Sequence, residues 1–364
     1  MGVVFEKNKL VLAPMVDQSE LAWRMLARRY GAQMTFTPMI NINQFTRDVK
    51  YRKKMMEFSD EDRPLIVQFC GNSPELFAQS AKFVEDYCDG VNLNLGCPQG
   101  IARRGHYGSY LQDEWDLISS MVRQCASSVK VPVSVKIRIF PDVDRTVAYA
   151  KMLEAAGAAF IAVHGRTREQ NGQKTGLADW EQIRAVKSAV NIPVIANGNV
   201  LYFEDIEKCL RATKADALMS AEPQLYNPAL FSGQQPCVFQ VCLEYLDFAR
   251  TYPCSMSIVR GHLFKVLRNT FNKHEEHRET LAEAKTLEDI ESLIKDLEQL
   301  CQNSCQVTPW SPDLEPRPIA HPHWICQPYV RQISDGSAED KHGNEVLIAP
   351  RLSTHFTFQD FKQQ

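Results

Sequence analysis

Polar side chains that could bind or react follow several short apolar runs of this chain. They are Gln68, Asn92, Asn94, Cys97, Lys136, Arg138, His164, Asn197 and Asn199, with Gly198 between the last two. Each one alone is consistent with a structural role, such as a hydrogen-bonded amide or a lysine paired with an acid. Together, these amides, cations, imidazole and thiol would form a site for a large polar cofactor and a planar polar substrate.

Cys97 is the candidate for acid catalysis. It lies in LNLGCP, residues 93–98, where the preceding glycine and the following proline take it out of the apolar run. An ordinary thiol has a pKa of about 8.5, so it is mostly protonated near neutrality and can donate a proton. A cysteine after a strand is more often inert packing, but this turn favours the catalytic interpretation. His106 and His164 are the alternative acids.

Lys136 is the candidate partner for charge on a reduced cofactor. A cation beside the pyrimidine edge of a flavin stabilises the negative charge that arrives on reduction. A structural ion pair is the alternative. Gly198, between two asparagines, would let backbone amides approach a phosphate group.

The elements that must position these residues are eight short apolar runs, separated by amphipathic segments of helix length. The runs cover residues 10–13, 34–36, 65–69, 91–95, 133–137, 160–163, 193–196 and 217–219. Repeated βα units predict a parallel sheet. Eight of them predict an α/β fold, the TIM (β/α)8 barrel, in which functional residues lie at the carboxyl ends of the strands and phosphate often binds after the last two.

After Pro236 the pattern changes to helical spacing. Apolar residues recur at that spacing in residues 239–251, 257–272 and 287–301, which predicts a smaller all-helical domain. Prolines recur from Pro309 and predict an extended tail, although the aromatic residues 321–331 are expected to dock on folded structure. We therefore expect a barrel over residues 1–235, a helical domain over 236–308 and a proline-rich tail over 309–364.

Composition limits the class of protein. The 364 residues carry a formal net charge of -3 and are 44% apolar, and the first nine residues do not resemble a signal peptide. Eleven cysteines, scattered singly, suit a reducing compartment. We expect a cytoplasmic monomer, with the nucleus as a second location and no membrane segment. Cys301 and Cys305 lie on a helical pattern without nearby histidines, so no metal site is expected.

Basic residues are nevertheless clustered. Residues 47–54 hold five bases and one acid, and residues 260–273 contain Arg260, Lys265, Arg268 and Lys273 without an acid. Such blocks are usually solvated faces. The alternative is a surface that binds phosphate groups.

The chain resembles the dihydrouridine synthases. The residues that carry the resemblance are APM at 13–15, VQFCG at 67–71, LNLGCP at 93–98, VKIR at 135–138, VHGRTR at 163–168 and IANGNV at 195–200. The resemblance implies FMN held by Pro14, Met15, Gln68, Lys136, His164, Asn197, Gly198 and Asn199. It also implies phosphate contacts from the loop that contains Ala221 and Glu222, at the positions where many relatives have Gly-Arg. Asn94 and Arg138 match positions that contact the target uracil.

The resemblance further implies reduction of uridine to 5,6-dihydrouridine in tRNA, with NADPH or NADH as reductant. A hydride would pass from reduced FMN to uracil carbon 6 and a proton from Cys97 to carbon 5. Residues 101–111 and 260–267 look like the eukaryotic branch that modifies D-loop positions 16 and 17. Arg103 and Arg104, with Arg260, Lys265 and Arg268, would contact tRNA phosphates.

Two other functions stay open. A flavin barrel could reduce a small molecule, as dihydroorotate and dihydropyrimidine dehydrogenases do, but it would not need the basic helical domain. A catalytically idle tRNA-binding homologue would not need Cys97 and Lys136.

Overall fold

A computed structural model describes residues 9–303 and 322–330 of the 364-residue chain. The chain separates into two compact units. The first extends to Gln224 and includes Leu230–Gly233, and the second contains Leu225–Ala229 and the residues from Gln234 onward. Within the described ranges, no helix has both the length and the hydropathy that crossing a bilayer requires.

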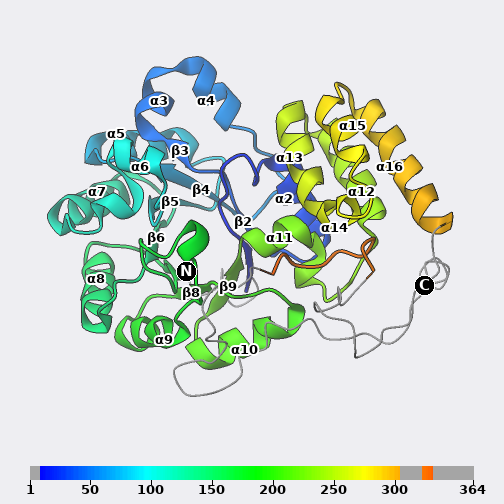
Figure 1. The fold of residues 1–364 in the computed structure, drawn as a ribbon. Helices are drawn as coiled ribbons and strands as arrows, with labels where there is room; N and C mark the ends of the chain where they lie inside the picture. Colours follow the sequence, from blue (N-terminus) through cyan, green and yellow to red (C-terminus); the bar gives the residue numbers. More distant parts are fainter. Residues whose placement is uncertain (1–8, 304–321, 331–364) are drawn as a thin grey trace. The chain divides into compact units, whose positions relative to one another are not determined.

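The first unit contains a closed barrel of eight parallel strands (Figure 1). The strands are β1 (Leu10–Leu12), β2 (Met34–Phe36), β4 (Leu65–Cys70), β5 (Gly90–Leu95), β6 (Val133–Arg138), β7 (Ile161–His164), β8 (Val194–Asn197) and β9 (Ala217–Ser220). Pairing of β2 with β4 and of β1 with β9 closes the ring, and the short β3 (Ile40–Asn41) extends one edge of β4. The predicted eight-strand barrel is confirmed.

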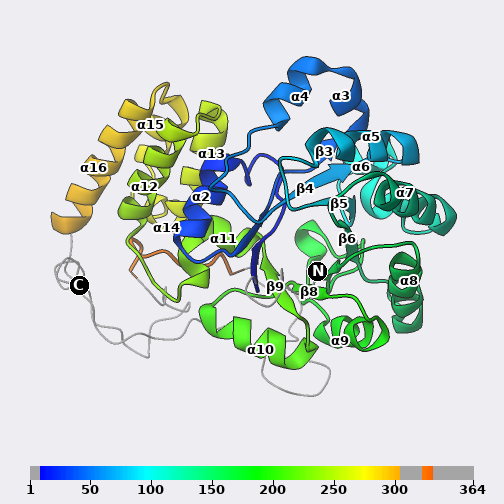
Figure 2. The ribbon, with the colours of Figure 1, turned by 180° about the vertical axis from the view of Figure 1, so that it is seen from behind.

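Helices surround this barrel, as Figures 1 and 2 show from opposite sides. They are α2 (Leu21–Arg29), α5 (Pro74–Val84), α7 (Trp115–Ser128), α8 (Val143–Ala155), α9 (Trp180–Ala189) and α10 (Phe203–Thr213). Ser73, Asp142 and Asp179 each accept a backbone N–H at the start of a helix, which fixes where α5, α8 and α9 begin. The loops between strands and helices hold α3 (Ile42–Arg47), α4 (Val49–Met55), α6 (Gly100–Gly105) and α11 (Glu222–Tyr226), with short 3-10 turns at Gly108–Leu111, Gly172–Lys174 and Pro228–Phe231.

The barrel interior is filled by apolar side chains from many strands. The buried cluster contains Val11, Ala13, Met34, Phe36, Ile66, Phe160, Ala162, Ile195, Ala217 and Met219. Because apolar side chains fill the interior, the polar residues that could bind a ligand lie at the ends of the strands.

The second unit is helical. It contains α12 (Val238–Thr251), α13 (Met256–Val266), α14 (Arg268–Phe271), α15 (His277–Glu283) and α16 (Leu287–Asn303). The helix expected over residues 257–272 is divided at Leu267, where residues 269–272 (NTFN) have low helix propensity. The short α15 was not expected, because seven residues carry too little periodicity to be recognised.

Residues 322–330 pack against the start of α12. Val238 N donates to Trp324 O at 2.8 Å and Cys326 N to Pro236 O at 3.0 Å, and Trp324, Ile325 and Cys326 are buried. This agrees with the docking expected for the aromatic stretch. The rest of the expected tail, residues 309–321 and 331–364, lies outside the described residues.

Candidate active site

Strand register brings the candidate residues to one end of the barrel. Gln68 on β4 lies opposite Asn92 on β5, and Asn94 lies opposite Lys136 on β6. Along the next strands, Arg138 lies opposite His164 and His164 opposite Asn197. Because all strands are parallel, these carboxyl ends share one face of the first unit.

A chain of amides crosses three strands. Gln68 Nε2 donates to Asn92 Oδ1 at 2.8 Å, and Asn94 Nδ2 donates to Gln68 Oε1 at 2.9 Å. Asn92 Nδ2 continues the chain to Ser134 Oγ at 2.9 Å. All four side chains are buried, so each amide has one fixed orientation. Gln68 keeps one N–H and one lone pair for a ligand.

Lys136 is held by Asn197. Its Nζ donates to Asn197 Oδ1 at 2.9 Å, and Asn197 Nδ2 donates to Met219 O at 2.9 Å. Burial, followed by the charge of Arg138, lowers the pKa of Lys136 to about 7. A nearby anion would favour the charged lysine and reverse this shift.

His164 is neutral and oriented by Arg166. Arg166 Nη1 lies 3.0 Å from His164 Nε2, and because a guanidinium only donates, Nε2 is the acceptor and Nδ1 carries the proton. Burial and the charges of Lys136, Arg138 and Arg166 lower the pKa of His164 well below its ordinary value. Arg166 also donates to Asn199 Oδ1. The sequence analysis gave Arg166 no role in the site, although it lies in the VHGRTR motif.

A tight turn presents Cys97. Asn94 Oδ1 accepts from Cys97 N at 2.9 Å and from Gly96 N at 3.1 Å. From the other side, Ser109 N and Ser109 Oγ donate to Cys97 O at 3.1 and 3.0 Å. Gly108 has φ +66°, and a Cβ atom there would lie 2.8 Å from Cys97 O. Gly108 and Ser109 therefore position Cys97, and no sequence signal distinguished them.

The Cys97 thiol stays protonated. Burial raises the pKa of Cys97, while a backbone hydrogen bond and the charges of Arg138 and Lys136 act in the opposite direction. Neither alternative acid is as suitable: neutral His164 accepts from Arg166, and exposed His106 lies 2.7 Å from Glu114. A partly exposed, protonated thiol can act as a general acid.

Arg138, at the end of β6, connects the loops that follow β5 and β7. Its Nε donates to Gly96 O at 2.9 Å, and its Nη1 donates to Thr167 O at 2.7 Å and Gln170 O at 3.1 Å. In the part of the chain that the structure describes, Nη2 donates to no acceptor. That nitrogen is available to a substrate carbonyl.

The turn after β8 suits a close backbone approach. Gly198 has φ +121° and Asn199 φ +59°, and a Cβ atom at Gly198 would lie 2.6 Å from the Cβ of Ala178. Only glycine fits this position.

After β1, Met15 N donates to Ser19 Oγ at 3.0 Å, which fixes the loop that contains Pro14 and Met15.

Buried polar atoms near the end of β9 lack partners. Ser220 Oγ and both amide atoms of Gln224 make no hydrogen bond within the described residues. Ala221 and Glu222 lie between them, where α11 begins. Because buried polar groups are normally hydrogen bonded, this end of β9 fits a polar ligand. Gln224 was missing from our sequence prediction.

The cations predicted to contact tRNA fall into two groups. Arg103 and Arg104 are exposed on α6, whose Ala102 packs in one cluster with Cys70 and Cys97. In the helical unit, Arg260 Nη1 donates to Ala284 O at 2.7 Å, and the Arg268 guanidinium lies 4.0 Å from the centre of the Tyr329 ring. Lys265 Nζ donates to Gly261 O at 3.2 Å. These three cations thus have partners within their own unit.

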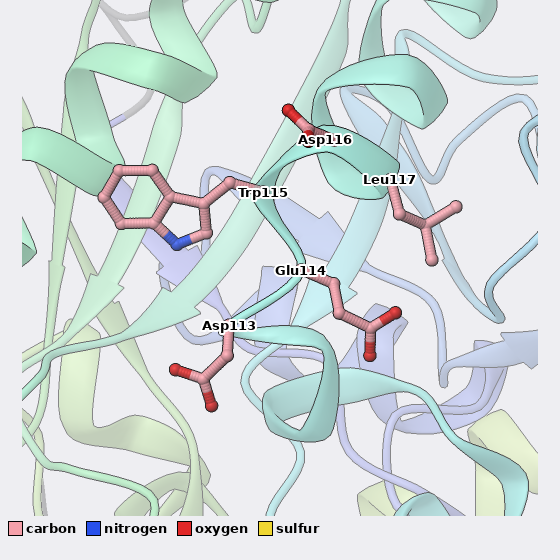
Figure 3. A pocket seen from close by; sticks show the side chains of 5 residues that line it. All are labelled: Asp113, Glu114, Trp115, Asp116 and Leu117. Carbon is pink, nitrogen blue, oxygen red and sulfur yellow. The ribbon is translucent and has the colours of Figure 1, made fainter.

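A shallow depression of about 400 Å³ lies at the start of α7 (Figure 3). It is lined by Asp113, Glu114, Trp115, Asp116 and Leu117, whose side chains fan out from one stretch of chain. Asp113 pairs with Arg145 at 2.5 Å and Glu114 with His106 at 2.7 Å. Its acidic rim would repel a phosphate, so it does not suit a nucleotide cofactor.

The dihydrouridine synthase (Dus) family matches residues 11–308. The chain is 50% identical over 337 residues to the Mus musculus protein named "tRNA-dihydrouridine(16/17) synthase [NAD(P)(+)]-like", covering 92% of this chain and 70% of that protein. It is 43% identical to the Saccharomyces cerevisiae tRNA-dihydrouridine(16/17) synthase, covering 93% and 87%. It is 35% identical to a Homo sapiens tRNA-dihydrouridine(20a/20b) synthase-like protein, covering 75% and 86%.

A solved structure shares the barrel fold alone. Histamine dehydrogenase from Rhizobium sp. 4-9 superposes with a TM-score of 0.50 at 11% identity, over 66% of this chain and about half, 49%, of that chain. The family match and the relatives that share it lead to one conclusion. The chain belongs to the dihydrouridine synthase family.

Proposed function

We propose that this protein reduces uridine to 5,6-dihydrouridine at positions 16 and 17 of the tRNA D-loop, with FMN as cofactor and NADPH or NADH as reductant. Its family makes it a tRNA-dihydrouridine synthase, which is an oxidoreductase. The choice of positions rests on the relatives named for 16/17, which are 50% and 43% identical, against 35% for the relative named for 20a/20b.

The residues at the carboxyl end of the barrel fit FMN. Lys136 offers a cation, the turn at Gly198 offers backbone amides, and Ser220 and Gln224 offer buried polar atoms without partners among the described residues. Pro14, Met15, Gln68, His164, Asn197, Asn199, Ala221 and Glu222 complete the proposed binding set. When bound, FMN supplies the hydride for uracil carbon 6.

The observation that carries the proposed chemistry is Cys97. Its backbone is held from both sides by Asn94 and Ser109, and burial keeps its thiol protonated. Cys97 gives its proton to uracil carbon 5, while Arg138 Nη2 and Asn94 orient the ring. Lys136 and Arg138 then stabilise the thiolate that forms, because both cations favour the charged form.

The substrate must reach these residues as a single base. Extruding a base costs a few kcal/mol and costs least in loops, which favours D-loop uridines. Arg103 and Arg104 on α6 would contact phosphates beside the entering base, and Arg260, Lys265 and Arg268 would contact phosphates farther along the tRNA. This assigns catalysis to the barrel and divides the tRNA contacts between α6 of the barrel unit and the helical unit.

The decisive test uses tRNA from a strain that lacks its own 16/17 synthase. The purified full chain, NADPH and this tRNA are incubated, and dihydrouridine is mapped position by position. We expect a yellow protein and dihydrouridine at positions 16 and 17. Dihydrouridine only at other positions of the tRNA would contradict the assignment to positions 16 and 17. A yellow protein that reduces dihydropyrimidine precursors but not tRNA would favour the small-molecule alternative, and tRNA binding without NADPH oxidation would favour the idle homologue.

A further inference from the structure

Three side chains from distant parts of the sequence converge within the helical unit. Cys301, near the end of α16, has its Sγ 3.4 Å from His323 Nε2 and 3.8 Å from His274 Nε2. The three atoms all lie within 4.8 Å of one another. Cys301 is buried, and both imidazoles are partly buried. The two histidines lie 27 and 22 residues from Cys301 in the sequence, which is why our sequence analysis expected no metal here.

We propose that His274, Cys301 and His323 bind a zinc ion that fastens residues 322–330 to the helices of this unit. Zinc bonds of about 2.3 Å to sulfur and about 2.0 Å to nitrogen, at tetrahedral angles, separate the two ligand atoms by roughly 3.6 Å. The distances of 3.4 and 3.8 Å lie on either side of that value. One thiolate with two imidazoles is a ligand set that suits zinc among the common metals.

Hydrogen bonding alone does not account for the arrangement. A thiol has one proton, so it can donate to one imidazole nitrogen and not to both. Zinc binds the neutral imidazole of a histidine and the thiolate of a cysteine. On binding, the Cys301 proton passes to solvent and the thiolate sulfur bonds to the ion. The fourth position is left for water or another donor.

The surrounding contacts fix the two histidines. Thr270 Oγ1 donates to His323 O at 2.9 Å, and Thr270 O accepts from His274 N at 3.0 Å. Thr270 therefore holds both imidazole-bearing segments. Glu276 Oε1 lies 3.9 Å from His274 Nδ1 and closer, at 3.2 Å, to His277 Nδ1.

The first experiment measures metal content. The full chain, purified without a histidine tag or chelator, should contain about one zinc per chain by elemental mass spectrometry. Cys301→Ser and His323→Gln should lose most of this zinc. The matched control is Cys326→Ala, which removes a buried cysteine from the same segment as His323 and should keep the zinc. Zinc content equal to wild type in both Cys301→Ser and His323→Gln would overturn the proposal.

A second measurement needs no variant. Wild-type protein that has been stripped and reloaded with Co²⁺ should show a thiolate-to-cobalt charge-transfer band and tetrahedral ligand-field bands. Chelator should lower the melting temperature of the wild type, and its flavin content would report separately on the barrel. A wild-type chain that binds neither added Zn²⁺ nor Co²⁺, or whose cobalt form lacks the sulfur band, would show that the cluster is not a metal site.

Discussion

Cys97 and Cys301 are both cysteines with nitrogen groups nearby, yet their surroundings support different chemistry. Cys97 is partly exposed at the end of the barrel, and its charged neighbours are Arg138 and Lys136. Cys301 is buried in the helical unit between two imidazole nitrogens. Cations stabilise a thiolate that forms transiently after proton donation, whereas neutral imidazoles can share a metal ion with a permanent thiolate.

The number and kind of charged or metal-binding neighbours therefore decide what a thiol does. Cys70, which is buried and has a pKa raised to about 12 by burial, has neither kind of partner in the contacts described and is read as a packing residue.

The largest effect is expected for Cys97→Ala. General acid catalysis is worth about 10²- to 10⁴-fold, so dihydrouridine formation should fall by that factor. Flavin content and reduction by NADPH should be unchanged, because hydride transfer to the cofactor needs no protein acid. Stopped-flow reduction by NADPH, followed by oxidation with tRNA, separates the two half-reactions.

The control for that experiment is Cys70→Ala. It should keep both half-reactions and lose only modest stability, since Cys70 packs beside Ala102 and Tyr107. Near-normal oxidation by tRNA in Cys97→Ala would identify another acid and would remove the distinction between the two cysteines.

A tenfold or larger loss is expected for Gly108→Ala. The added Cβ would lie 2.8 Å from Cys97 O, and φ +66° disfavours any side chain, so the Cys97 turn must shift. Gly172→Ala is the matched control, because φ is +57° there and nothing lies within 4 Å of the added Cβ. Both variants should lose about 1 kcal/mol of stability, but only Gly108→Ala should slow oxidation by tRNA. Equal rates in the two variants would contradict the positioning role.

The pH dependence of the affinity for FMN tests the role of Lys136, one of the two cations near Cys97. Because the pKa of Lys136 is lowered to about 7 in the free protein, the lysine is increasingly neutral above that pH. Binding the anionic ring of reduced FMN then requires proton uptake, so the affinity for reduced FMN should fall by up to about tenfold per pH unit above pH 7 and level off below it. Lys136→Met should bind reduced FMN more weakly, without this slope. Anaerobic titration with reduced FMN measures both, and a pH-independent wild type would assign Lys136 another role.

The fold was largely predictable, because eight apolar runs with helices between them specify a closed parallel barrel. The strand-end residues could be predicted for the same reason: their position follows from chain order. Gly108, Ser109 and Gln224 could not, since their importance depends on loops that fold back on Cys97 or on atoms left without partners. A sequence motif shows which residues lie at the end of a strand, whereas contacts between loops can be seen only in the three-dimensional structure.

The helical unit shows the same limit more strongly. Arg260 and Arg268 were predicted from charge clustering, but a sequence does not show that Arg260 bonds Ala284 O or that Arg268 lies over Tyr329. Likewise, Cys301 gave no metal signal because its histidines are remote in the chain. Contacts between side chains that are distant in the sequence depend on the tertiary structure, and the local spacing of residues does not predict them.

The smallest effect is expected from charge reversal at Arg260, Lys265 and Arg268. It should raise KM for tRNA a few-fold and leave NADPH oxidation without tRNA unchanged, while the lost contacts to Ala284 and Tyr329 lower the melting temperature. Arg103→Glu with Arg104→Glu should act more strongly, because each exposed arginine that contacts a phosphate contributes about 1 to the slope of log Kd against log salt. The double variant at Arg103 and Arg104 should therefore reduce the slope of log Kd against log salt more than the triple variant at Arg260, Lys265 and Arg268 does. The reverse order would mean that the trio, despite its internal partners, is the main phosphate-binding surface.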